Sequence, residues 1–420
     1  VPALGTLVAE PLYVLADTAI IGHVGTNELA GLALASTVLL TVHALLIFLA
    51  YGTTGPVARL ISSGREDEAA DRSLQGLWLA VVLGVAGSAL IYLARTPLLE
   101  LFGADAAVMS HADRYLSISL LGFPFMLIML AAGGSFHGRQ NTTTPLALAI
   151  GGAVINLVLE SVLIFGMGYG VGASALSTVI SQVLVSTVAV VLTMRWVRQK
   201  SDQRRPQPAV MFALLKAGQA LVLRTAALRG SMTLSVVVAS RMGAVEVAAH
   251  QVALQIWGTL ALALDAVAIA GQALTGKWLG TGNLDRARAA ARRMIEVDIG
   301  VGVVAGLIVI VLRSPISSIF SDDLAVTELV AGVLIVVGLM QPLNGHVFAL
   351  DGILIGAGDL GYLARSMVLA AAVFVACAGI VVVADLGLGS LWLAMCALMA
   401  SRAVALQLRW RSDRWLHTSI

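Results

Sequence analysis

Long apolar runs separated by short polar segments dominate the sequence. A helix needs roughly 20 mostly apolar residues to cross a bilayer. Twelve runs have about this length: 3–24, 29–58, 74–94, 115–137, 146–166, 172–194, 225–242, 249–276, 296–312, 328–356, 364–384 and 388–408. The second run is long, and Gly52 to Pro56 offers a place where it could bend. The pattern predicts an all-α membrane protein with twelve transmembrane helices.

The composition supports lipid as the solvent of this chain. Of its 420 residues, 59% are hydrophobic and 12% are charged, whereas a soluble domain is about one quarter charged. One soluble core of this size could not hide so much apolar surface from water. The two cysteines, Cys377 and Cys396, provide neither a disulfide framework nor a metal-binding spacing.

The positive charges predict the orientation. An even number of spans places both termini on one side, and Lys and Arg mark the cytoplasmic side. With cytoplasmic termini, the cytoplasmic segments carry Arg59, Arg65, Arg72, Arg139, the basic residues of 195–224 and 277–293, Arg365, Arg409, Arg411 and Arg414. The opposite loops carry only Arg95, Arg114, Arg241 and Arg313. We therefore expect a multi-pass protein of the cell membrane with both termini in the cytoplasm.

A basic segment divides the chain into two halves. Residues 195–224 contain RWVRQKSDQRRPQP and follow the sixth run of twelve. We interpret them as a cytoplasmic linker between an N-lobe, residues 1–194, and a C-lobe, residues 225–420.

The two halves match each other at a constant offset of 218 residues. The matching pairs are Gly25 and Gly243, Glu28 and Glu246, Gly64 and Gly282, Arg95 and Arg313, Pro97 and Pro315, Phe102 and Phe320, Pro124 and Pro342, Gly134 and Gly352, and Gly138 and Gly356. Because each half has an even number of spans, the halves share one orientation. They form a parallel repeat with a pseudo-two-fold axis along the membrane normal, a design that transporters use to alternate access to a cavity between two bundles.

Two carboxylates lie inside predicted spans of the first half. An ionisable group in a membrane helix costs about 3 kcal/mol or more, so it indicates a function. Asp17 lies four residues after Tyr13, and Glu160 lies four residues after Asn156, so each pair shares a helix face. Thr178 could face the same cavity. A carboxylate in a dry site can exchange a proton for another cation, which predicts cation coupling through Asp17 and Glu160.

This acidic pair has no counterpart in the second half. At the offset of 218, Ser235 replaces Asp17, and Ala378 and Phe374 replace Glu160 and Asn156. The second half instead has Asp265, Asp298 and Asp351. Asp351 and Asp265 are candidates for contact with substrate, although Asp351 could instead brace a helix break. Asp298 could simply lie near the membrane interface.

The absence of common catalytic motifs from the sequence disfavours an enzyme. The sequence has no GxxxxGK[ST], HExxH or GxSxG, and His43, His137, His250 and His346 have no metal-ligand spacing. We expect no cofactor and no metal. A membrane-embedded enzyme would need converging catalytic groups, and a channel would differ from an exchanger by lacking saturable counterflow.

Several motifs resemble the multidrug and toxic compound extrusion (MATE) family, in its DinF-like branch. They are LADTAIIGHVGTNELAG, NLVLESVLIFGMGYGVGASALSTVISQ, AAHQV, LDAVAIAGQALTGKWLG and LDGILIGAGD. The resemblance covers essentially the whole chain. It implies twelve helices in two lobes and cation-coupled export of drugs or other amphipathic organic molecules.

The resemblance also implies roles for individual residues. The coupling aspartate of the first helix falls on Asp17, and Tyr13, Asn156 and Thr178 match its neighbours. The branch pattern has aspartate where this chain has Glu160. The middle of the seventh span lacks the glutamate of sodium-coupled relatives, which favours protons over sodium.

The resemblance leaves one alternative within transport. It is a flippase for lipids or lipid-linked sugars, but such relatives have more helices and more cationic cavities. Only Arg229 and Arg139 could supply positive charge to a cavity here. We expect small organic substrates, a lipid surrounding, no nucleic acid and a monomer.

Overall fold

The computed structural model describes residues 26–100, 105–167, 169–321 and 323–417. The predicted first span, with Tyr13 and Asp17, lies outside these residues. Where it is described, the chain is helical and has no β-strand. It divides into two compact units, Val1–Lys216 and Ala217–Ile420.

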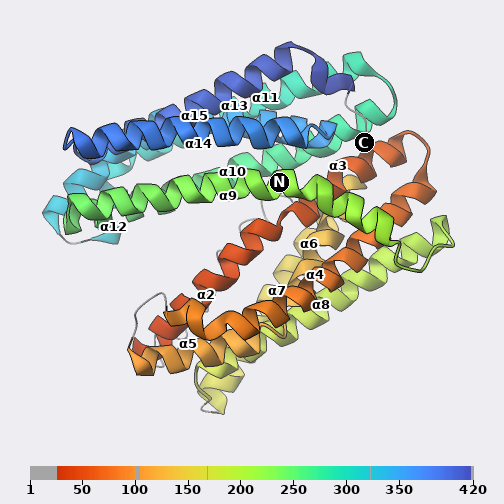
Figure 1. The fold of residues 1–420 in the computed structure, drawn as a ribbon, viewed down its shortest axis with the longest axis horizontal. Helices are drawn as coiled ribbons and strands as arrows, with labels where there is room; N and C mark the ends of the chain where they lie inside the picture. The colour runs from red at the N-terminus through yellow and green to blue at the C-terminus, as the bar shows by residue number, and fades with distance from the viewer. Residues whose placement is uncertain (1–25, 101–104, 168, 322, 418–420) are drawn as a thin grey trace. The chain divides into compact units, whose positions relative to one another are not determined.

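Eight helical elements lie before the division in the described residues of the first unit, and Figure 1 shows their arrangement. They are α2 (Thr26–Leu46), α3 (Phe48–Ser62), α4 (Glu66–Glu100), α5 (Ala106–Ser119), α6 (Phe123–Gly138), α7 (Thr143–Ser161), the π-helix η1 (Val162–Gly166) and α8 (Val171–Lys200). Helices α3, α4 and α6 pack against one another, and α8 packs against α5, α6 and α7.

The division between the units falls inside α9 (Pro208–Met242). The second unit continues with α10 (Ala244–Gly280), α11 (Leu284–Val311), α12 (Arg313–Phe320), α13 (Leu324–Ala357), α14 (Leu360–Val383), α15 (Leu388–Arg411) and the short 3-10 helix η2 (Arg414–His417). Helices α10, α11 and α13 pack on one another and form its centre, and α15 packs against α13 and α14 (Figure 1).

The described helices confirm the membrane class. Ten helical stretches are long and apolar enough to cross a bilayer, and the pair α5 and α6 raises this to eleven if the pair is one span. These eleven correspond to the predicted runs from 29–58 to 388–408. Large apolar side chains such as Leu93 and Val383, 80% and 89% exposed, cover the outer surface, as lipid contact requires.

Two helix interruptions differ from the sequence-based expectation. The second run breaks at Ile47, between α2 and α3, whereas Pro56 lies inside the continuous helix α3. The fourth run bends by 52° between α5 and α6, where Gly122 precedes Pro124. In the second unit Met340 takes the place of Gly122, and α13 continues through Pro342. Proline alone therefore does not break this span.

The connector between the halves is shorter than its polar sequence suggests. Helix α8 continues to Lys200 and α9 begins at Pro208, so only 201–207 are non-helical. Gln75 on α4 holds this segment, because its amide donates to the Arg205 carbonyl at 3.1 Å and accepts from the Gln207 N–H at 2.7 Å. The connector thus packs on the first unit.

The repeat recurs in the contacts between helices. A Cβ added at Gly134 would collide with the Ala50 backbone, and one at Gly352 would collide with the Ala268 backbone. In the same way, Gly84 abuts Pro124 and Gly302 abuts Pro342. Each pair is related to its equivalent by 218 residues. The halves therefore use the same glycines to bring the same helices into close contact.

Candidate functional site

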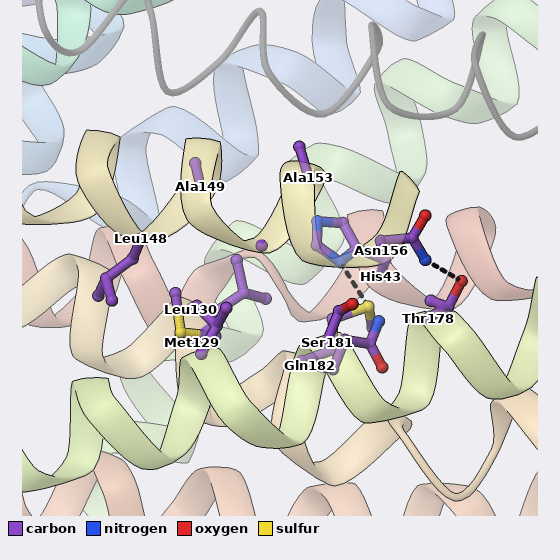
Figure 2. A pocket seen from close by; sticks show the side chains of 13 residues that line it. His43, Met129, Leu130, Leu148, Ala149, Ala153, Asn156, Thr178, Ser181 and Gln182 are labelled. Atoms are coloured by element: carbon purple, nitrogen blue, oxygen red, sulfur yellow. Dashed lines mark hydrogen bonds between the residues drawn. The ribbon is translucent and has the colours of Figure 1, made fainter. Parts of the chain in front are cut away.

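A cavity of about 300 Å³ lies inside the first unit, among α2, α6, α7 and α8. It is lined by His43, Met126, Met129, Leu130, Leu148, Ala149, Gly152, Ala153, Asn156, Thr178, Ser181, Gln182 and Val185. Figure 2 shows these side chains around it. Small residues on α7 leave space there, and two methionines supply adaptable thioethers.

Asn156 on α7 and Thr178 on α8 form the polar end of this cavity (Figure 2). The Asn156 amide nitrogen donates to the Thr178 hydroxyl at 3.1 Å and to the Ser177 hydroxyl at 3.2 Å. Both hydroxyls donate in turn to the Ser174 carbonyl, at 3.0 Å from Thr178 and 2.8 Å from Ser177. The structure thus brings together two residues that the sequence analysis selected, and this network fixes their orientation.

Glu160 lies one helical turn beyond Asn156 on α7, and its side chain is fully buried. The π-helix Val162–Gly166 begins two residues later. This π-helix follows the end of α7 and leads into the segment before α8. Glu160 is therefore a membrane-embedded acid beside an irregular turn and close in sequence to the cavity wall.

His43 and Gln182 add polar groups to the cavity that the sequence analysis did not select for it. The His43 ring nitrogen lies 3.2 Å from the Met126 sulfur and links α2 to α6. Gln182 follows Thr178 by four residues, so it shares the same face of α8. That spacing in LSTVISQ was a usable signal for Gln182, whereas no local pattern indicated His43 or Met126.

The other members of the predicted coupling site lie outside the described residues. These are Asp17 and Tyr13. The described part of the site therefore consists of the cavity, its amide–hydroxyl end and Glu160.

Asp351 in the second unit lies between two arginines. Its side chain is 6% exposed, and it accepts from Arg224 on α9 at 2.5 Å and from Arg402 on α15. It thus joins α13 to α9 and α15. Arg224 accordingly belongs to a membrane helix and not to the polar connector, where the charge count placed it.

Asp265 and Asp298 come from neighbouring helices of the second unit. Asp265 on α10 is partly buried, Asp298 on α11 is fully buried, and the two are close enough to interact electrostatically. Asp298 is therefore enclosed by protein and faces neither lipid nor water.

Arg139 lies just after α6 and is held away from the cavity lining. Its guanidinium stacks over the rings of Phe136 and Trp196, 4.7 and 4.6 Å from their centroids. Burial lowers the pKa of Arg139 to about 10. Arg139 is thus engaged at the end of α8 and contributes no positive charge to the described cavity.

Comparison with known proteins decides the family. The MatE family model matches residues 2–162 and 221–381, which are the two halves of the repeat. The chain belongs to the MatE family. As a MatE protein it is a membrane transporter.

Curated MatE relatives extend over nearly the whole chain. Protein DETOXIFICATION 44, chloroplastic, of Arabidopsis thaliana is 32% identical over 96% of this chain and 79% of its own length. DNA damage-inducible protein F of Escherichia coli K12 is 30% identical over 98% of this chain and 90% of its own. The second relative supports the DinF-like resemblance noted from the motifs.

Solved structures share the fold of this MatE chain. A MOP superfamily transporter from Pyrococcus furiosus superimposes with a TM-score of 0.90, at 20% identity over 100% of this chain and 95% of the other. A MATE crystallised in the bent conformation gives 0.89, at 20% identity over 98% and 94%. These structures have the twelve-helix, two-lobe fold that the sequence predicts.

Proposed function

We propose that this transporter is a proton-coupled antiporter that exports drugs or other amphipathic organic compounds by alternating access. The observation that carries the proposal is the cavity of the first unit. It joins an apolar, methionine-containing wall to the Asn156–Thr178 polar end, and the buried Glu160 lies one turn beyond.

The cavity suits substrates with an apolar body and one polar group. Its volume of about 300 Å³ lies at the lower end of the range for small-molecule pockets. Methionine side chains repack around different shapes, which supports acceptance of several compounds. The amide and hydroxyl groups at one end would orient a polar group of the substrate.

Coupling is assigned to the carboxylates Asp17 and Glu160. A carboxylate inside a membrane helix is neutral when protonated and attracts cations when ionised. Loss or gain of this charge changes the affinity of the cavity for a cationic or polar substrate. Protons are favoured over sodium because residues 208–242 of α9 contain no Asp or Glu.

The proposal also includes the location, the oligomeric state and the orientation of the protein. We place the protein in the cell membrane as a monomer, with both termini in the cytoplasm. The contacts at one end of the first unit are consistent with this orientation. Lys200 pairs with Glu66 at 2.5 Å, so the segments around Arg65 and the 201–207 connector lie at the same end.

Counterflow in proteoliposomes tests this function. Purified protein is reconstituted, vesicles are loaded with one fluorescent organic cation, and unlabelled candidates are added outside. Saturable exchange with the unlabelled candidates, together with saturable efflux of the labelled cation driven by an imposed pH gradient, supports the proposal. Unsaturable flux indicates a channel, and movement of labelled lipid without organic cations indicates a flippase, so either result contradicts it.

A further inference from the structure

Asp298 on α11 differs from the other buried acids described in the second unit. Asp351 is bound by Arg224 and Arg402, and Asp359 is bound by Arg409. Asp298 is 0% exposed, and neither of its carboxylate oxygens has a hydrogen-bond partner among the described residues. An ionised carboxylate is poorly tolerated in such a place, because it loses water and gains no compensating donor.

The position of Asp298 explains why water is excluded. Asp298, Gly302 and Gly306 follow one another at intervals of four residues and form one face of α11. Added Cβ atoms at Gly302 and Gly306 would collide with the α13 backbone at Gln341 and Gly338. This face of α11 is therefore pressed directly onto α13, and Asp298 lies in the contact.

The facing stretch of α13 supplies a buried polar group that lacks a donor. Gly345 abuts the Asp298 backbone, and Asn344 precedes it. The Asn344 nitrogen donates to the Gln341 side chain at 3.4 Å, while the Asn344 side-chain oxygen is buried and has no partner in the described part of the chain. This part of the α11–α13 contact thus contains unsatisfied acceptors on both helices. A proton on Asp298 would convert one of them into a donor.

The charged groups around Asp298 offer it no positive partner. Asp265 on α10 interacts with it electrostatically and has the same sign. On α13, His346 lies near Gln407 of α15, and Asp351 is already paired. On α11 itself, Glu296 is exposed and bound to Arg293.

On α12, which also packs against α11, Arg313 donates to the Ile310 carbonyl. No element packed against α11 therefore brings a cation to the Asp298 carboxylate among the described residues.

The repeat shows that the fold does not need these polar groups. At the offset of 218, the counterparts of Asp298, Asp265, Gln341 and Asn344 are Ala80, Ile47, Phe123 and Met126. Ala80 and Phe123 are buried, and the same Gly–Pro contact holds α4 to α6 there. One packing geometry is thus filled with apolar groups in the first unit and with acids and amides in the second.

We propose that Asp298, with Asp265 beside it, is a proton-binding site inside the second unit. Asp298 carries its proton in the conformation described and releases it when α11 and α13 separate enough to admit water. That release supplies a second proton to the transport cycle, a role that rests on the proposed proton-coupled antiport. The binding of the proton itself does not depend on that function.

Infrared spectroscopy of the reconstituted protein tests the site without any substrate. The C=O stretch of protonated carboxylic acids is recorded as pH is raised. Wild-type protein should show a band that Asp298→Asn removes. The control Glu296→Gln, an exposed acid two residues away, should retain it. Asp298→Ala should also lack the band, and it should fold because Ala80 occupies the equivalent position.

An unchanged band in both Asp298 variants would overturn the site. Removal of the band by sodium at constant pH would overturn the choice of ligand, because it would show a metal cation replacing the proton.

Transport stoichiometry tests the role in the cycle separately. The number of protons moved per substrate should fall by one in Asp298→Asn, while Glu296→Gln keeps the wild-type ratio. An unchanged ratio together with a lost band would overturn the second-proton role. If wild-type protein moves no protons with substrate but the band is lost in Asp298→Asn, the antiport proposal fails and the site stands.

Discussion

The Asn156 side chain on α7 donates to the Thr178 hydroxyl on α8, with the nitrogen and oxygen 3.1 Å apart. The two residues are 22 positions apart in the sequence, and their contact joins two membrane helices at the wall of a cavity. Because Thr178 also donates to the Ser174 carbonyl, its lone pairs face Asn156. Among the described residues no donor is bonded to the side-chain oxygen of Asn156, so this oxygen is the group most able to accept from a substrate.

We expect Asn156→Ala to weaken substrate binding while the fold is retained. A neutral hydrogen bond contributes about 1 kcal/mol, so the apparent KM for export should rise about fivefold. The measurement is the substrate dependence of uptake into inverted vesicles. Thr187→Val is the matched control, because Thr187 lies on the exposed side of α8 and its hydroxyl donates to the Val183 carbonyl of the same helix. Equal KM values for the two variants would show that Asn156 does not contact substrate.

Glu160 should act through its charge and not through its volume. Glu160→Asp keeps a titratable group in the same helix and should retain substantial transport, whereas Glu160→Gln removes the charge and should lose it. Proton movement and substrate movement are measured in the same vesicles. Glu100→Gln, an exposed acid at the end of α4, should behave as wild type. Normal transport by Glu160→Gln would make the residue purely structural.

The close approach at Gly134 should be needed for stability. A methyl group at Gly134 collides with the Ala50 backbone, while the neighbouring Gly133 has open space around its Cα. Overpacking of this kind costs about 1–3 kcal/mol, so Gly134→Ala should unfold at a lower temperature in detergent than Gly133→Ala. Gly352→Ala, the equivalent change in the second unit, should be destabilised in the same direction. Equal melting temperatures for Gly133→Ala and Gly134→Ala would rule out the collision.

Most of the architecture could be predicted from sequence because membrane spans depend on local hydrophobicity. Eleven of the twelve predicted runs coincide with described helices or a bent pair of helices. The break at Ile47 was not predictable, since neither glycine nor proline marks it. Pro56 was misleading, because the helix α3 continues through this proline.

The candidate site was predictable only where its members share a helix face. Asn156 and Glu160 are one turn apart, and Thr178 and Gln182 are one turn apart, so sequence spacing can group them. The ion pairs of Asp351 with Arg224 and Arg402 join residues 127 and 51 positions away. Such pairings depend on how helices pack, and no local pattern reports them.

Accessibility of introduced cysteines should reveal the orientation. In a background with Cys377 and Cys396 replaced by alanine, Asp202→Cys lies in the exposed connector and Asp385→Cys lies in the exposed turn between α14 and α15. An impermeant thiol reagent added to intact cells should label Asp385→Cys and leave Asp202→Cys unlabelled. The reverse labelling pattern would contradict cytoplasmic termini.

Proton coupling has energy enough to drive the cycle. Each unit of pKa difference between two states of a carboxyl corresponds to about 1.4 kcal/mol, and a potential of 100 mV adds about 2.3 kcal/mol per charge moved. Two units and that potential together bias a two-state equilibrium by about 5 kcal/mol, enough to take it from mostly one state to mostly the other. Permanent neutralisation of a coupling acid removes this bias.

Internal pH in proteoliposomes is the most direct measurement of this coupling. Vesicles containing either wild-type protein or Asp17→Asn are exposed to substrate, with and without a sodium gradient. Wild-type protein should move protons against substrate at a rate that the sodium gradient does not change, and Asp17→Asn should fold yet show no substrate-driven proton flux. Wild-type transport that follows sodium alone, or full proton counterflow in Asp17→Asn, would contradict proton-coupled antiport through this residue.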